Sequence, residues 1–236
     1  MNNLTVTLLL TLTCFFLSTT TFAQDKKTTE AKQKTVSSKA FVKKMKPIIS
    51  QIDSIKNGVE LLGIAQKFEE MTEQYPDEWL APYYTAYCYN LMAYSGRDSV
   101  QRDAALEHAN NALDQAQNLN PASSENLLLQ AYIYQMQIDI NPETRSKKIA
   151  PIITSLLEEV EKNDPENPRL YFLKAQRLFF SSNPSQKNLM EACPIAQEAV
   201  FRYATHEPDS DIAPQWGENM ADYIAGLCQE LDFENK

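Results

Sequence analysis

Four almost evenly spaced prolines divide most of this chain into units of similar length. Pro76, Pro121, Pro165 and Pro208 lie 45, 44 and 43 residues apart. Proline disrupts the interior of a helix but is tolerated in the first turn of one. Each of these prolines therefore predicts a boundary between two helices. A recurrence of this length is typical of repeat proteins, in which each repeat is one supersecondary unit.

The residues before each proline follow a helical period. Positions 12, 8 and 5 residues before the four prolines hold only apolar or aromatic side chains, and this spacing places each set on one helical face. The twelve residues are Ile64, Phe68, Met71, Ala109, Leu113, Ala116, Ile153, Leu157, Val160, Ala196, Val200 and Tyr203. Since the chain also has only five glycines and almost no alternating strand pattern, we predict an all-α fold.

A second helix is predicted after each of the first three prolines. Ten residues beyond them lie Ala86, Ala131 and Ala175, flanked at helical spacing by apolar residues. An alanine repeated at this position is expected where two helices approach too closely for a larger side chain. The same frame, extended backward from Pro76, predicts one more helix before a turn at 57–58.

These features resemble the tetratricopeptide repeat family, whose helix B closes before a proline. The segment 116–121, Ala-Gln-Asn-Leu-Asn-Pro, is similar to a family helix B ending, and the resemblance covers about 45–208. It implies a right-handed α-solenoid of about four helix pairs. The units here exceed the family length of about 34 residues, and the excess falls in three polar stretches, 95–103, 141–148 and 181–188. We expect longer turns or extra helical turns there.

The last segment departs from the repeat, since Glu218 stands where the other units carry alanine. Its apolar residues nevertheless have the spacing of one amphipathic helix. They are Ile212, Trp216, Met220, Ile224 and Leu227. We expect this helix to be a C-terminal cap, because a terminal repeat must shield the open end of a stack.

The N-terminus has the pattern of an export signal. An apolar run at 4–17 is followed by Thr21-Phe22-Ala23, which predicts a signal peptide, 1–23, cleaved near Ala23. The mature protein is then periplasmic or secreted and has no transmembrane span, with a lipid anchor on Cys14 as the alternative. Residues 24–40 are rich in Lys, Thr and Ser and predict a disordered linker, which leaves 41–236 as the repeat domain.

Charge is distributed unevenly along the chain. Residues 24–59 carry nine Lys and three acids, or +6, so the remainder carries −9 − 6 = −15. A body this acidic repels phosphate backbones, and nucleic acid is therefore not an expected partner.

The sequence contains no recognisable catalytic motif. A glycine-rich phosphate loop, a Gly-x-Ser-x-Gly elbow, a Cys-x-x-Cys pair and a His-Glu-x-x-His motif are all missing. His108 and His206, the only histidines, do not have metal-ligand spacing. We therefore expect no enzyme activity, no cofactor and no metal site.

Cleavage of the signal would leave three cysteines in a compartment that permits disulfides. Cys193 lies on the apolar stripe before Pro208, and Cys228 lies on the capping segment after it. Antiparallel packing would bring the two level, so a disulfide and two separate buried thiols are both open. Cys88 is expected to be a small core residue.

The resemblance also implies a binding face, because positions 2, 5, 9 and 12 of helix A line a concave groove in the family. The residues that map to this groove, and that we expect to bind a partner, are Tyr83, Tyr87, Asn90, Leu128, Tyr132, Gln135, Arg169, Phe172 and Phe179. Aromatic rings beside amide and Arg groups suit a peptide segment or a partner helix. The first hypothesis is an exported scaffold that binds a protein or peptide in this groove and supports envelope assembly.

Two other interpretations remain open. The same aromatic groove could bind a small molecule or a glycan in the periplasm. Alternatively, the aromatic side chains thicken the core, and the stack has no open groove.

Overall fold

The computed structural model describes residues 37–234 apart from 53, 56 and 182–184. The predicted signal peptide, 1–23, and residues 24–36 of the predicted linker lie outside this part. The described residues belong to one unit, Ser37–Lys236.

The described residues form nine α-helices and contain no β-strand, so the predicted all-α class is confirmed. The helices are α1 (Lys39–Ile52), α2 (Gly58–Gln74), α3 (Leu80–Ser95), α4 (Ser99–Leu119), α5 (Ser124–Ile140), α6 (Pro142–Asn163), α7 (Pro168–Phe179), α8 (Gln186–Thr205) and α9 (Glu218–Glu234).

The prolines that set the repeat lie between helices, as predicted. Pro76 separates α2 from α3, Pro121 separates α4 from α5, and Pro165 separates α6 from α7. The fourth, Pro208, follows the end of α8. The backbone restriction that proline imposes agrees with a helix boundary at each of these four positions.

The extra length of each unit becomes additional turns at the start of a long helix. Helices α4, α6 and α8 have 21, 22 and 20 residues and begin inside or beside the three polar stretches. Each begins with a capping side chain, because Asp98, Asn141 and Ser185 accept hydrogen bonds from backbone N–H groups of the first turn.

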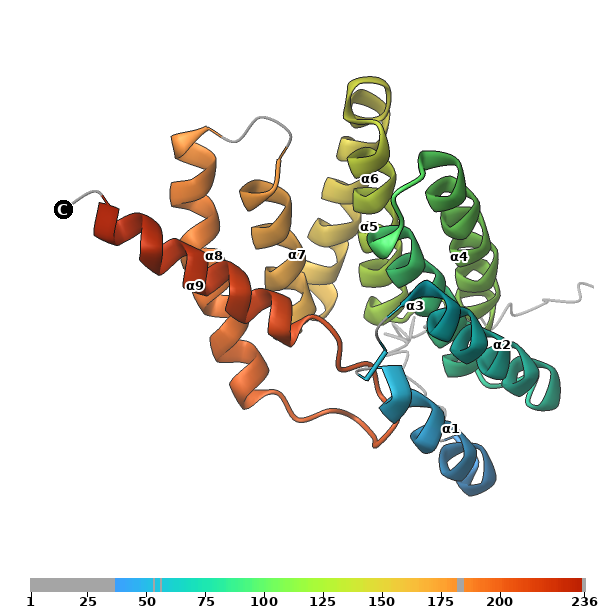
Figure 1. Ribbon diagram of the computed structural model, residues 1–236. Coiled ribbons are helices and arrows are strands. Elements are labelled where there is room, and N and C mark those ends of the chain that lie inside the picture. The colour runs from blue at the N-terminus through green and yellow to red at the C-terminus, as the bar shows by residue number, and fades with distance from the viewer. Residues whose placement is uncertain (1–36, 53, 56, 182–184, 235–236) are drawn as a thin grey trace, which may run out of the picture. The chain divides into compact units, whose positions relative to one another are not determined.

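Each helix packs against its neighbour in sequence, and the odd-numbered helices also pack against one another. Helix α1 contacts α3, α3 contacts α5, α5 contacts α7, and α7 contacts α9 (Figure 1). Among the described residues the even-numbered helices α2, α4, α6 and α8 do not contact each other. The odd-numbered helices therefore form an inner row, and the even-numbered ones flank it.

The positions that the repeat frame predicts to be internal are internal. Ala86, Ala131 and Ala175 are all buried on the inner row. Of the twelve stripe residues on the even-numbered helices, ten are buried, and Val200 and Tyr203 are partly buried against the same core. The spacing of the apolar residues thus correctly predicted which side chains are buried on these helices.

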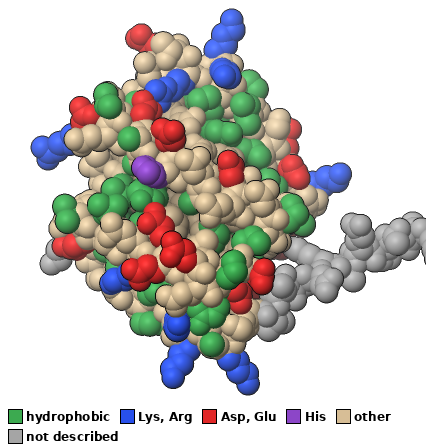
Figure 2. Space-filling model, turned by 90° about the vertical axis from the view of Figure 1, so that its right-hand side faces the viewer, with side chains coloured by type: hydrophobic (Ala, Val, Ile, Leu, Met, Phe, Trp, Pro, Cys, Tyr) green, Lys and Arg blue, Asp and Glu red, His purple; other side chains and the backbone are tan. Residues whose placement is uncertain are grey.

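The surface on the side of α2 and α4 carries apolar and uncharged areas as well as charged side chains (Figure 2). On the side of α2 and α4, Figure 2 shows acidic side chains in the middle of the face and Lys and Arg mainly toward its edges. None of the described helices combines the length and the apolar character needed to cross a membrane.

The C-terminal segment differs from the prediction of one helix that contains all five apolar residues. Helix α9 begins at Glu218, so Ile212 and Trp216 lie in the preceding loop, 206–217, called here the α8–α9 loop. Gly217 has a φ of +102°, which is outside the helical range, so no continuous helix can run from Trp216 into α9. A Cβ at this position would meet the Tyr203 hydroxyl and the Phe172 ring, so the site also requires the small residue.

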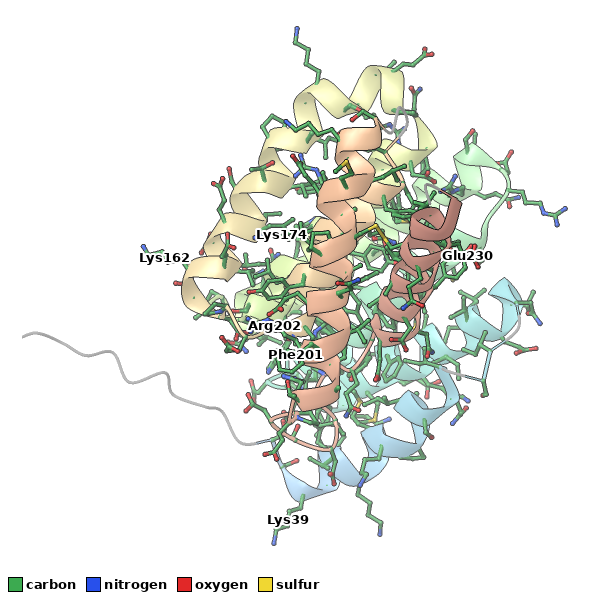
Figure 3. All side chains as sticks on the ribbon, turned by 90° about the vertical axis from the view of Figure 1, so that its left-hand side faces the viewer. Lys39, Lys162, Lys174, Phe201, Arg202 and Glu230 are labelled. Atoms are coloured by element: carbon green, nitrogen blue, oxygen red, sulfur yellow. A yellow bond between two sulfur atoms is a disulfide. The ribbon has the colours of Figure 1, made fainter. Side chains whose placement is uncertain are left out.

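A disulfide joins α8 to α9 through Cys193 and Cys228, whose Cα atoms are 5.6 Å apart (Figure 3). Cys88 is a free, buried cysteine, and burial raises the pKa of its thiol to about 12. Since the bridge closes a loop across 35 residues, it restricts the unfolded chain.

Removing this bridge is expected to lower the free energy of unfolding by about 2–4 kcal/mol. Urea denaturation of the Cys193→Ser/Cys228→Ser variant against the oxidised wild type measures the difference. The same variant with and without reductant is the control, and its midpoint should not move. Equal midpoints for the oxidised wild type and the variant would contradict the expectation.

Candidate functional site

The nine residues predicted to line a groove come together on the inner row, but they are not open to solvent. Tyr83, Tyr87 and Asn90 lie on α3, and the others lie on α5 and α7. Seven of the nine are at most 8% exposed, and Tyr87 and Phe179 are partly buried. In this structure these side chains belong to the core, which agrees with the alternative in which the aromatic rings thicken the core, and their role in binding a partner stays a prediction.

Trp216 of the α8–α9 loop fills the space that the groove would occupy. Its indole stacks on Tyr87 and Tyr132, with ring centroids 5.5 and 5.4 Å away, and meets Phe172 edge-on at 6.2 Å. The indole Nε1 donates a hydrogen bond of 2.7 Å to the Tyr83 hydroxyl. Trp216 is 7% exposed, so the chain itself covers these residues of the inner row.

Further hydrogen bonds hold the α8–α9 loop in place. The Tyr84 hydroxyl donates to the carbonyl oxygens of Ile212 and Ala213 at 3.1 and 3.0 Å. The Tyr203 hydroxyl donates to the Trp216 carbonyl oxygen at 2.8 Å. The loop is thus anchored to α3 and α8 on both sides of the indole.

The predicted binding residue Arg169 is part of a buried ion pair instead. Its Nη2 donates to Glu125 Oε1 at 2.7 Å, and the two side chains are 2% and 15% exposed. Burial alone would lower the pKa of Arg169, but the Glu125 carboxylate raises it above the ordinary value. The Asn167 amide donates to the same carboxylate oxygen at 2.7 Å, so this pair fastens α5 to α7.

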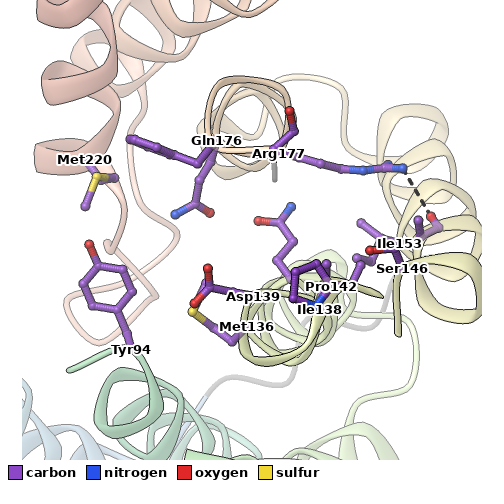
Figure 4. Close-up of a pocket in the computed structure, with 14 residues that line it drawn as sticks. Tyr94, Met136, Ile138, Asp139, Pro142, Ser146, Ile153, Gln176, Arg177 and Met220 are labelled. Atoms are coloured by element: carbon purple, nitrogen blue, oxygen red, sulfur yellow. Dashed lines mark hydrogen bonds between the residues drawn. The ribbon is translucent and has the colours of Figure 1, made fainter. Parts of the chain in front are cut away.

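A separate cavity of about 410 Å³ lies beside this filled groove (Figure 4). The last turns of α3, α5 and α7 form it together with the first half of α6 and the start of α9. Its apolar lining consists of Tyr94, Met136, Ile138, Pro142, Ala150, Ile153, Phe180 and Met220. Its polar lining includes Gln135, Asp139, Gln176 and Arg177.

The cavity has a closed floor and an aromatic mouth. Ile153 and Met136 are 0% and 6% exposed, whereas Tyr94 and Phe180 are each 50% exposed. Large aromatic rings that are half in water beside a concave apolar surface are the usual lining of a small-molecule site. The arrangement can therefore bind a mainly apolar ligand that contacts these rings.

The polar groups of the wall differ in how fully they are paired. Asp139 is bound by Arg102 at 2.6 Å. Arg177 donates to the Thr154 hydroxyl at 2.9 Å and to the Ala150 carbonyl oxygen at 3.4 Å, and burial lowers its pKa. Gln176 is 6% exposed, and its Oε1 has no hydrogen-bond partner among the described residues.

Of the nine predicted residues, only Gln135 lines this cavity. The frame missed Tyr94, Met136 and Phe180 because they lie beyond the last position that the family uses on each helix. It missed Arg177 because this residue falls between two of those positions. The sequence contained one signal of this cavity. Residues 142, 146 and 181, which also line the cavity, fall inside the polar stretches that lengthen the repeats.

The described residues contain no group of three or more His, Cys, Asp or Glu side chains placed to hold a metal ion. The lining residues of the cavity likewise include neither His nor Cys.

Comparison with known proteins gives one informative similarity. No protein-family model matches the chain, and no curated protein does. The assignment to the tetratricopeptide family therefore stays a prediction. Among solved structures, the chain is similar to the HusA haemophore from Porphyromonas gingivalis, with a TM-score of 0.71 and 28% sequence identity. The match covers 81% of this chain and 94% of that one.

Proposed function

We propose that this protein is an exported binding protein for a haem-class ligand and that the 410 Å³ cavity is its binding site. The similarity to a haemophore over most of both chains supports the ligand class. The observation that carries the proposal is the cavity with Tyr94 and Phe180 half exposed at its mouth. A haemophore works outside the cell, which agrees with the export signal predicted from the sequence.

The lining fits a flat, largely apolar ring. The cavity falls within the range of about 300–1,000 Å³ that small-molecule sites occupy. Haem iron is held in proteins by His, Cys, Met or Tyr side chains, and the lining offers Tyr94, Met136 and Met220 of these types. Only these three side chains are of a type that can bind the iron. Most of the affinity should therefore come from burial of the ring between apolar and aromatic side chains.

The scaffold hypothesis has less support. A peptide in the predicted groove would have to displace Trp216, which is buried and hydrogen-bonded to Tyr83. The alternative of a small ligand is retained, and its site moves from the groove to the neighbouring cavity. Within this proposal the four helix pairs form a tetratricopeptide-like solenoid capped by α9, and the protein binds its ligand without catalysis.

The test is an absorption titration of the purified mature protein with haem. Wild type should bind, and the Tyr94→Ala/Phe180→Ala variant should bind about tenfold more weakly, because two aromatic contacts are lost. Tyr223→Ala is the matched control, since this exposed tyrosine on α9 does not line the cavity. Absence of binding by wild type would contradict the function, and equal affinities would contradict the site.

A further inference from the structure

We propose that Arg177 determines the specificity of this cavity by binding a carboxylate of the ligand, so that the site selects acidic tetrapyrroles over uncharged ones. This inference rests on the proposed function for its ligand class.

The six arginines of the chain differ in whether a carboxylate neutralises their charge. Arg102, Arg145, Arg169 and Arg202 each pair with a carboxylate at a distance of at most 2.7 Å. Arg97 is exposed to water. Arg177 is partly buried, and no carboxylate of the described residues pairs with it.

The guanidinium of Arg177 is held in position but not saturated. It reaches from α7 across the cavity to α6 (Figure 4) and bonds only neutral acceptors there, the Thr154 hydroxyl and the Ala150 carbonyl. A guanidinium has five N–H donors, so further donors remain for a ligand. Its planar fork matches a carboxylate in two-point geometry.

The environment of the cavity also favours this role. A partly buried cation without an anion is costly, and a ligand carboxylate would remove that cost. The one acid in the lining, Asp139, is already bound by Arg102 at 2.6 Å, so it does not compete for Arg177.

Gln176, the neighbouring residue on α7, presents a second polar group to the cavity. The side chain points into the cavity in Figure 4. Its buried Oε1 lacks a partner among the described residues, although buried carbonyl groups normally have one. A ligand N–H, or a water held beside the ligand, would satisfy this acceptor.

The experiment compares metal-free protoporphyrin IX with its dimethyl ester, which keeps the ring but lacks both charges. Binding is followed by fluorescence for wild type, Arg177→Gln and Arg97→Gln. Wild type should prefer the diacid by about tenfold or more, the size expected for a charged hydrogen bond. Arg177→Gln should lose that preference while its affinity for the ester stays unchanged, and Arg97→Gln should behave as wild type.

The comparison of the two probes on wild type needs no variant, so misfolding of Arg177→Gln cannot hide the answer. Equal wild-type affinities for diacid and ester would overturn the role of Arg177. So would a variant that loses both probes equally. If wild type binds neither probe, the proposed function itself fails, which is a different result from loss of the preference alone.

Discussion

Glu125→Ala is expected to lower the free energy of unfolding by about 3–5 kcal/mol, because it leaves the Arg169 charge buried and unpaired. Arg169 is 2% exposed, and its Nη2 lies 2.7 Å from the Glu125 carboxylate. The same carboxylate accepts from the Asn167 amide at 2.7 Å and from the Tyr83 hydroxyl at 3.4 Å. One side chain of α5 thus satisfies donors from α3 and α7, and its loss affects three helices of the inner row.

Two comparisons separate this effect from ordinary loss of a surface charge. Lys46 and Asp211 form an ion pair of the same length, 2.7 Å, but their side chains are 53% and 68% exposed. Asp211→Ala should therefore cost less than about 1 kcal/mol. Glu125→Leu/Arg169→Met removes both charges and should be more stable than Glu125→Ala alone. Urea denaturation measures all three, and similar losses for Glu125→Ala and Asp211→Ala would contradict the expectation.

The helices and their inward faces could be predicted because both depend on local features. Proline restricts its own backbone and that of the preceding residue, and Pro76, Pro121 and Pro165 lie between helices. Because other prolines lie inside helices, it was the repeat spacing that singled out these three. Apolar spacing then fixed which face of each helix turns inward. Ala86, Ala131 and Ala175 are buried for this reason.

The state of the groove could not be predicted, because an inward face does not reveal what covers it. The covering residue, Trp216, is 133 positions from its partner Tyr83. Its spacing with Met220 and Ile224 suggested a helix, but Gly217 breaks that helix and turns the indole toward α3 and α5. The reading in which the aromatic rings thicken the core agrees with the observed burial.

The cavity was beyond prediction for a related reason. Five helices contribute to its wall, and each supplies residues from one end only. Helical periodicity identifies faces along a helix and carries no information about how far two helices extend past each other. The lengthened units were the one hint, because the added first turns of α6 supply Pro142 and Ser146 to the cavity wall.

The α8–α9 loop and α9 connect the filled groove with the open cavity. Trp216 closes the groove, and Met220, four residues later on α9, forms part of the cavity wall. The disulfide to Cys193 holds the same helix against α8. A change that releases Trp216 should therefore disturb the placement of α9 as well as the core.

Trp216→Ala is expected to lower the free energy of unfolding by about 3–5 kcal/mol, since it removes a buried ring and leaves a cavity. Trp216→Phe keeps a ring but loses the Nε1 hydrogen bond to Tyr83, so it should cost less. Phe201→Ala is the control, because this side chain on α8 is 61% exposed (Figure 3) and should change stability little. Calorimetry or urea denaturation measures the stability loss of each variant and so gives their order. A loss below about 1 kcal/mol for Trp216→Ala would mean that the indole is a loosely held plug, and a peptide could then compete for the groove on energetic grounds.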